Sequence, residues 1–318
     1  MTKLLKIILI FFLAASIPAA GQTLRYSVSP RNAETVLKTD RIRAQVEHLT
    51  DPALGGRATG TAGAQQVALW LENQFRDLAL KPLGGSFQHG FHVGGLFGRN
   101  VIGLLPGTAR PSRYVVVMAH YDNLGVLNGT LYPGADSNAS GVAALLQLAR
   151  MFRHMNDCGK SYATGLLFVG LDAKEKDLAG ADALWNLLEQ VHLDISLVVN
   201  LDQLGATLAP LTPGHPHYLM MLSEEAGGHR STLESVNRGQ HIGLELAYDY
   251  YGSKDFTKLF YRRICDQRVF LEHGIPAVMF TSGITLNNNK PADTAASLDY
   301  TVLRKRIQLI FYYLDKVL

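Results

Sequence analysis

Side chains that could bind a metal ion or carry a proton stand just after several apolar segments of the sequence. His120 and Asp122 follow YVVVMA, Glu175 comes shortly after LLFVGL, and Asp202 follows LVVNL. Zinc prefers imidazole nitrogen and carboxylate oxygen as ligands, and a nearby carboxylate can accept a proton from metal-bound water. In the HxD pattern, Asp122 can hold the second ring nitrogen of His120 and fix its tautomer. These residue types indicate metal-assisted hydrolysis.

Asp136 is a further candidate ligand, in the Gly- and Ser-rich loop YPGADSNASG that precedes a predicted helix. An isolated Asp in this position is more often a plain helix N-cap. Here it joins His120, Glu175 and Asp202, which gives one imidazole and three carboxylates. A carboxylate can bridge two zinc ions, so this set is compatible with a pair of metals.

Short apolar runs alternate with amphipathic segments and must position these residues. The runs are NVIGLLPG from Asn100, YVVVMAH from Tyr114, LLFVGLD from Leu166, LVVNLD from Leu197 and AVMFTSG from Ala277. Helical spacing predicts helices over residues 62–75, around 142–152 and over 303–317. The pattern predicts an α/β fold with an open, largely parallel sheet that has helices on both faces. Such sheets bind ligands at the carboxyl ends of their strands.

The first residues, 1–21, have the pattern of a secretory signal peptide. Lys3 and Lys6 precede an apolar stretch that ends in small residues, and a retained membrane anchor is the alternative. We therefore expect residues 22–318 to form a single domain that is exported to the periplasm or secreted. No later segment is long and apolar enough to span a bilayer, so no membrane association is expected after cleavage.

The charge and cysteine content narrow the range of partners. The formal net charge is only +3, and no Lys/Arg cluster alternates with aromatic residues, so nucleic-acid binding gets no support. Cys158 and Cys265 would meet an oxidising compartment after export, where they could form one disulfide or stay unpaired. Neither has metal-site spacing. The oligomeric state does not follow from the sequence.

An ordered set of motifs resembles the zinc exopeptidase family that contains the bacterial leucyl aminopeptidases and the glutamate carboxypeptidase-like proteins. The motifs are GGRATGTAG, MAHYDNLG, GADSNASGVAALLQLAR, LLFVGLDAKEKDLAGA, NLDQLG, GIPAVMF and KPADT, in order over roughly residues 55–318. Each motif alone is moderately specific, whereas the ordered set is highly specific. The resemblance implies an open, mostly parallel mixed sheet of about eight strands between helices.

The resemblance also implies roles for individual residues. Asp136 would bridge two zinc ions, His120 and Asp202 would complete one metal site, and Asp122 would orient His120. The family's second metal site uses the later Glu of a Glu-Glu pair and a His four residues before the Asp of an H-T-P-x-D-T-like motif. Glu175 aligns with that Glu, and the first Glu of the pair is the family's general base.

This sequence departs from the family pattern at two positions. Lys174 aligns with the general base, and a protonated Lys cannot accept a proton from metal-bound water. Asn289 aligns with the His ligand, four residues before Asp293, and an amide oxygen is a poor zinc ligand. The second metal site would then keep only Asp136 and Glu175 from the protein.

These departures predict a site that holds one zinc ion or none, with the Lys174 ammonium near the vacated position. Loss of a general base typically costs about 10²–10⁴ in rate, which favours impaired or lost peptidase activity. The cleft would then bind a peptide or amino-acid-like ligand. The alternatives are an active zinc aminopeptidase or exopeptidase with an altered site, and a single-metal enzyme such as a glutaminyl-cyclase-like cyclotransferase.

Two further segments are candidates for the lining of the ligand pocket. Asp266 and Gln267 align with a segment where the family often has Asp-His. Tyr248, Tyr250 and Tyr251 could form an aromatic wall beside it, with core or surface packing as the alternative role. The identity of the ligand cannot be read from these residues.

Overall fold

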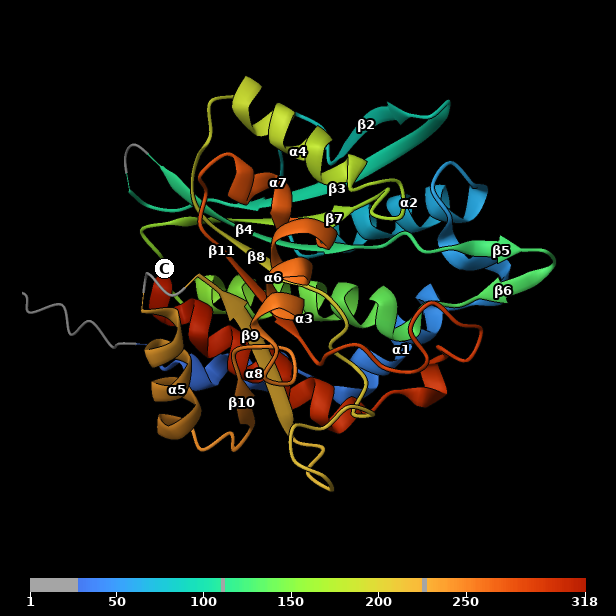
Figure 1. Ribbon diagram of the computed structural model, residues 1–318. Coiled ribbons are helices and arrows are strands. Elements are labelled where there is room, and N and C mark those ends of the chain that lie inside the picture. Colours follow the sequence, from blue (N-terminus) through green and yellow to red (C-terminus); the bar gives the residue numbers. More distant parts are fainter. Residues whose placement is uncertain (1–27, 110–111, 225–227) are drawn as a thin grey trace, which may run out of the picture.

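The computed structural model describes residues 28–109, 112–224 and 228–318, and its centre is a nine-stranded sheet (Figure 1). The strands are β1 (Lys81–Pro82), β2 (Gln88–Val93), β3 (Leu96–Leu105), β4 (Arg113–His120), β7 (Gly165–Leu171), β8 (Asp194–Leu201), β9 (Tyr218–Ser223), β10 (Glu245–Ala247) and β11 (Ala277–Thr281). The order is β1-β3-β7-β4-β8-β11-β9-β10, with β2 paired to β3. The expected signal peptide, residues 1–21, lies outside the described residues.

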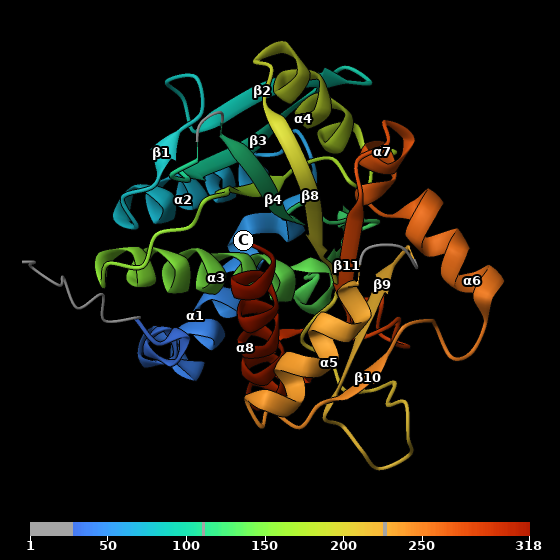
Figure 2. The same cartoon turned by 90° about the vertical axis from the view of Figure 1, so that its left-hand side faces the viewer.

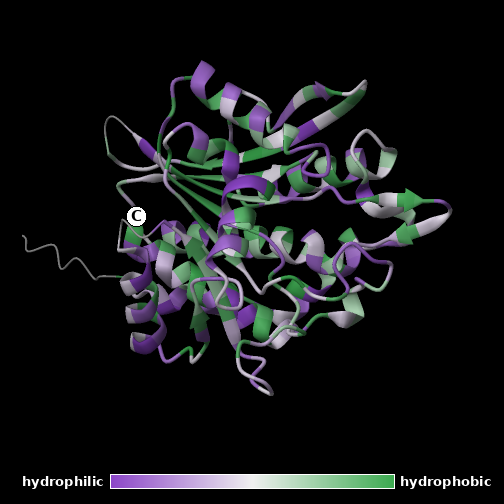
Figure 3. Cartoon of the chain, in the orientation of Figure 1, coloured by the Kyte–Doolittle hydropathy of each residue, from purple (hydrophilic) through white to green (hydrophobic). Residues whose placement is uncertain are grey.

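Helices cover both faces of the sheet, as Figure 2 shows. They are α1 (Thr39–Leu49), α2 (Ala62–Asp77), α3 (Ser140–Asp157), α4 (Ala179–Gln190), α5 (His229–Gly239), α6 (Lys254–Leu259), α7 (Gln267–Glu272) and α8 (Tyr300–Val317). The larger apolar core joins α1, α2, α3, α5 and α8 to one face, and a smaller core joins α4 and α7 to the other. The strands between them are mainly apolar (Figure 3).

The pairing of the central strands brings the expected site residues to one edge. Strand β4 runs parallel to both β7 and β8, and β8 runs parallel to β11. In this register His120 pairs with Leu171, and Met118 pairs with Asn200. The carboxyl ends of β4, β7 and β8 therefore lie side by side, and the segments that follow them meet there.

The predicted fold class is confirmed, as are the five predicted strands and the three predicted helices. The sequence reading did not assign β9, whose segment YLMMLS is buried but rich in Leu and Met rather than β-branched residues. It also did not assign the hairpin of β5 (Gly125–Leu127) and β6 (Thr130–Tyr132), which extends from the body in Figure 1. Three-residue strands give too little alternation to be recognised.

Two expectations about chain chemistry can be compared with the described residues. Cys158 is exposed and Cys265 is buried, and both are free thiols, so they do not form the disulfide that the sequence left open. Across residues 28–109, 112–224 and 228–318, no helix is both long and apolar enough to cross a membrane.

Candidate functional site

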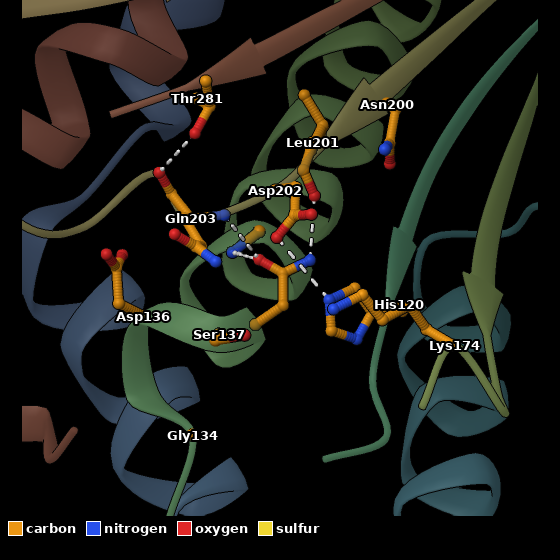
Figure 4. Close-up of polar contacts among 12 residues, drawn as sticks. His120, Gly134, Asp136, Ser137, Lys174, Asn200, Leu201, Asp202, Gln203 and Thr281 are labelled. Carbon is orange, nitrogen blue, oxygen red and sulfur yellow. Dashed lines mark hydrogen bonds and ion pairs between the residues drawn. The ribbon is translucent and has the colours of Figure 1, made fainter. Parts of the chain in front are cut away.

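His120 closes β4 and lies between two carboxylates at the edge of the sheet. Its Nδ1 is 3.1 Å from the backbone oxygen of Asp122 and 3.6 Å from Asp122 Oδ1. On the other side, Nε2 is 3.5 Å from Asp202 Oδ1, just after β8 (Figure 4). Burial alone would lower the pKa of His120, but contacts with Asp122 and Asp202 outweigh it and raise the pKa to about 10. The imidazolium form is therefore favoured.

Asp122 ties the end of β4 to the segment that follows β7. Its two carboxylate oxygens accept the backbone N–H groups of Lys174 and Glu175, each at 3.1 Å. Burial would raise the pKa of Asp122, but His120 and these two amides lower it. Asp122 thus contacts His120 and also fixes the backbone that carries Lys174 and Glu175.

The side chains of Lys174 and Glu175 form an ion pair inside the site. Lys174 Nζ lies 3.1 Å from Glu175 Oε1, and the two side chains are only 13% and 19% exposed. Burial would lower the pKa of Lys174, but the charges of Asp202 and Glu175 raise it above its ordinary value. A permanent cation therefore stands beside the carboxylate that was expected to bind the second metal.

Asp136 does not take the position of a bridging carboxylate. Its Oδ1 accepts hydrogen bonds from Gly205 N at 2.7 Å, Ala206 N at 3.1 Å and Ser140 Oγ at 3.1 Å. In Figure 4 its carboxylate points away from His120. Asp136 therefore joins its own loop to the segment after β8, which corrects the expectation that it faces the metals. Burial raises the pKa of Asp136 to about 7.

Ser137, the next residue, lies between Asp136 and His120 in Figure 4. It is buried, and its Oγ has no hydrogen-bond partner among the described residues. The Asp293 carboxylate fixes this turn, because it accepts the backbone N–H of Asp136 at 2.7 Å and of Ser137 at 3.0 Å. The peptide bond between Ser137 and Asn138 is cis. The loop thus places a hydroxyl, not a carboxylate, on the side of His120.

Arg57 joins the end of β4 to the loop at Gly134, and it was not among the site residues predicted from the sequence. It is fully buried and has a left-handed backbone, with φ at 61°. Its guanidinium donates to the backbone oxygens of Tyr121 at 2.8 Å and Gly134 at 2.9 Å, and also to those of Leu49 and Pro133. Burial lowers the pKa of Arg57 to about 10. The sequence feature that could have indicated its role is its position within the motif GGRATGTAG.

A cavity of about 250 Å³ lies beside the Lys174 ammonium. It is lined by Lys174, Asp202, Gln203, Tyr250, Phe260, Ile264, Cys265, Met279, Ile284, Asn288 and Asn289. Asn289 therefore lies in the same cavity as Lys174 and Asp202. Neither Asp266 nor Gln267 lines it as expected, because both are fully buried, and the preceding residue, Cys265, lines the cavity instead. Burial raises the pKa of Asp266 to about 7.

The donor set does not fit a pair of zinc ions. Within the described ranges, no group of three or more His, Cys, Asp or Glu side chains is arranged to hold a metal. Asp136 faces away, Glu175 is paired with Lys174, and Asn289 offers an amide. His120 Nε2 and Asp202 Oδ1 lie 3.5 Å apart, and neither atom has a hydrogen-bond partner in the described part of the chain. Catalytic zinc sites usually have three protein ligands.

Comparisons with known proteins agree with this architecture. The sequence profile described as Peptidase family M28 matches residues 100–314. A probable zinc metalloprotease of Pyricularia oryzae is 27% identical over 308 residues, which cover 86% of this chain and 60% of that protein. The chain spans roughly half the length, 45% to 60%, of the first curated relatives it matches.

Two solved structures show the same fold. The Legionella pneumophila LapA aminopeptidase superposes with a TM-score of 0.71 at 16% identity, over 91% of this chain and 74% of that one. The glutaminyl cyclase of Porphyromonas gingivalis gives a TM-score of 0.69 at 19% identity, over 88% and 99%. At these identities the likeness shows the fold alone.

Replacing Arg57 should weaken the whole site. We expect Arg57→Met to lower the free energy of unfolding by about 3 kcal/mol or more, because it leaves buried carbonyl groups without donors. Urea denaturation measures this loss. The control is Arg76→Met, which removes an exposed guanidinium that pairs with Glu72 four residues earlier, and it should cost less than about 1 kcal/mol because Glu72 keeps its hydrogen bond from Gln88. Equal losses in the two variants would contradict the role given to Arg57.

Proposed function

The chain belongs to peptidase family M28, and from this premise we propose an exported, aminopeptidase-like protein that binds a peptide or amino-acid-like ligand with impaired or lost peptidase activity. The family's metal is zinc, which supplies the hydrolytic chemistry in members that keep a complete site. The observation that carries the proposal is the Lys174–Glu175 ion pair. Export rests on the signal-peptide pattern of residues 1–21.

Lys174 stands at the position of the general base, so the site lacks the proton acceptor that hydrolysis requires. A general base must be unprotonated at the working pH and must reach the proton that it accepts. The charges of Asp202 and Glu175 outweigh burial and raise the pKa of Lys174, so its amine stays protonated near neutral pH. Lys174 itself lines the cavity, and its backbone N–H donates to Asp122 Oδ1 at 3.1 Å.

Lys174 also supplies positive charge where the family places a metal. Its ammonium contacts Glu175 at 3.1 Å and interacts with Asp202. Two carboxylates in a partly buried site need such a charge, since they cannot both remain ionised and unpaired at low cost. The hydroxyl of Ser137 and the amide of Asn289 then complete a site in which the usual anionic and imidazole ligands are replaced by neutral groups.

The cavity beside Lys174 suits a ligand that has an ammonium group, a carboxylate and an apolar side chain. Asp202 and Lys174 both line the cavity, so the carboxylate of Asp202 offers a negative charge to an ammonium group and Lys174 offers a positive charge to a carboxylate. The rest of the lining is largely apolar, and includes Tyr250, Phe260, Ile264, Met279 and Ile284. Its volume, about 250 Å³, lies below the usual range for drug-sized ligands and favours a single residue or a short peptide end.

Restoring the family's groups should restore metal binding. We expect the triple variant Ser137→Asp, Lys174→Glu and Asn289→His to bind more zinc than the parent and to hydrolyse aminoacyl anilides about 10²-fold faster or more. Zinc per chain is measured by elemental analysis, and hydrolysis with and without added zinc. The control Lys176→Glu makes the same charge change at an exposed neighbour. A parent that already holds two zinc ions and is fully active would overturn the proposal.

A parent that binds one zinc ion and cyclises N-terminal glutamine, but does not hydrolyse the anilides, would instead support the single-metal alternative. The fold that it shares with a glutaminyl cyclase makes this assay worth running in parallel. An active parent with two zinc ions would support an altered aminopeptidase.

Lys174 should also stabilise the fold without metal. We expect Lys174→Met to lower the free energy of unfolding by about 2 kcal/mol, because Glu175 loses the cation at 3.1 Å and Asp202 keeps only His120 beside it. Added zinc should recover part of that loss in the variant and leave the parent's melting temperature unchanged. Thermal unfolding with zinc or a chelator measures both effects, with Lys176→Met as the control. Zinc stabilisation of the parent that matches that of Lys174→Met would contradict this role.

A further inference from the structure

A second cavity, of about 500 Å³, lies beside α6 and shares no lining residue with the candidate site. It is bounded by the end of β9, the first turn of α5, the segment after β10, and α6 with the turn that follows it. Its volume is in the range of small-molecule binding sites. Neither the family's chemistry nor the proposed function uses it.

Positive charge dominates the lining of this cavity. Its charged residues are Arg230, Lys254, Lys258, Arg262, Glu224 and Asp249. Arg262 and Glu224 pair with each other, so their charges cancel. Asp249 keeps one negative charge against the three other cations, and its Oδ1 accepts the backbone N–H of Gly252 at 2.7 Å. The remaining cations therefore exceed the available negative charge.

Three cations in the cavity have no carboxylate partner in the described part of the chain. No Asp or Glu oxygen there lies within ion-pair distance of Arg230, Lys254 or Lys258. Lys254 and Lys258 are one turn apart on α6 and so point to the same side. Arg230 is held in place by the Tyr248 ring, with Cζ at 4.8 Å from the ring centroid. Like charges gathered in this way repel unless an anion joins them.

Neutral donors complete the lining. Ser223 Oγ is buried and has no hydrogen-bond partner in the described residues, although the Ser223 residue lines the cavity. The guanidinium and the two ammonium groups together offer many donors and no acceptor. Phosphate and carboxylate oxygens are the acceptors that such donors bind most strongly, and a guanidinium binds them through two N–H groups at once.

We propose that this cavity is a binding site for a small dianionic ligand, whose phosphate or paired carboxylate oxygens contact Arg230, Lys254 and Lys258. One hydrogen bond connects the lining of this cavity to the lining of the candidate site. Thr257 lines this cavity, its Oγ1 accepts the backbone N–H of Tyr250 at 2.7 Å, and Tyr250 lines the other cavity. The proposal does not depend on whether the protein hydrolyses peptides.

Calorimetric titration with inorganic phosphate and, separately, with succinate tests the proposal at fixed ionic strength. We expect saturable binding of one anion per chain, weakened about tenfold or more in the double variant Lys254→Ala/Lys258→Ala. Both lysines are exposed, so this variant should fold, and its melting temperature without anion checks that it does. The control Arg263→Ala/Lys290→Ala removes the same charge outside this cavity and should change the affinity less than about twofold.

The two probes separate the two ligand chemistries. Tighter binding of phosphate supports a phosphorylated ligand, and tighter binding of succinate supports a dicarboxylate. Arg230→Lys keeps the charge but loses the two-pronged contact, so it should weaken the preferred anion more than the other. Absence of saturable binding, or equal losses in the double variant and its control, would overturn the proposal and leave only non-specific attraction between charges.

Discussion

Buried carboxylates at the ends of parallel strands need a positive charge beside them, and the rest of this site depends on how that need is met. Asp122, Asp202 and Asp266 are all nearly or fully buried where β4, β8 and the start of α7 meet. Unpaired, each would cost several kcal/mol in a low-dielectric interior. Here the cations come from the chain itself, chiefly from Lys174 and the ring of His120. A zinc pair would place further charge next to an ammonium that is already bound.

Hydrogen bonds between charged side chains and backbone groups, rather than metal coordination, hold the loops around the site. Arg57 donates hydrogen bonds to backbone oxygens just after β4 and at Gly134. Asp293 accepts hydrogen bonds from the backbone N–H groups of Asp136 and Ser137. Asp136 in turn binds the amides of the segment after β8. Buried hydrogen bonds of charged groups to backbone are strong, so the loop geometry can persist with no metal to anchor it.

Much of this could be predicted from the sequence, because apolar strands and the residues that close them have a clear pattern. The convergence of His120, Asp122, Glu175 and Asp202 follows from parallel strands, and the unusual Lys174 follows from motif alignment. The orientation of Asp136 could not be predicted. Adjacent residues in an irregular loop point to different sides, and hydrogen bonds from distant backbone decide which one faces inward. The role of Arg57 could not be predicted either, since its hydrogen-bond partners come from three separate segments of the chain.

The most direct measurement of the central claim is anomalous X-ray diffraction at the zinc absorption edge, from crystals of the unmodified mature protein grown with excess zinc. We predict at most one peak, between His120 and Asp202, and none beside Glu175, with the Lys174 ammonium in contact with the Glu175 carboxylate. Two strong peaks between His120 and Glu175, with Lys174 displaced, would contradict the account.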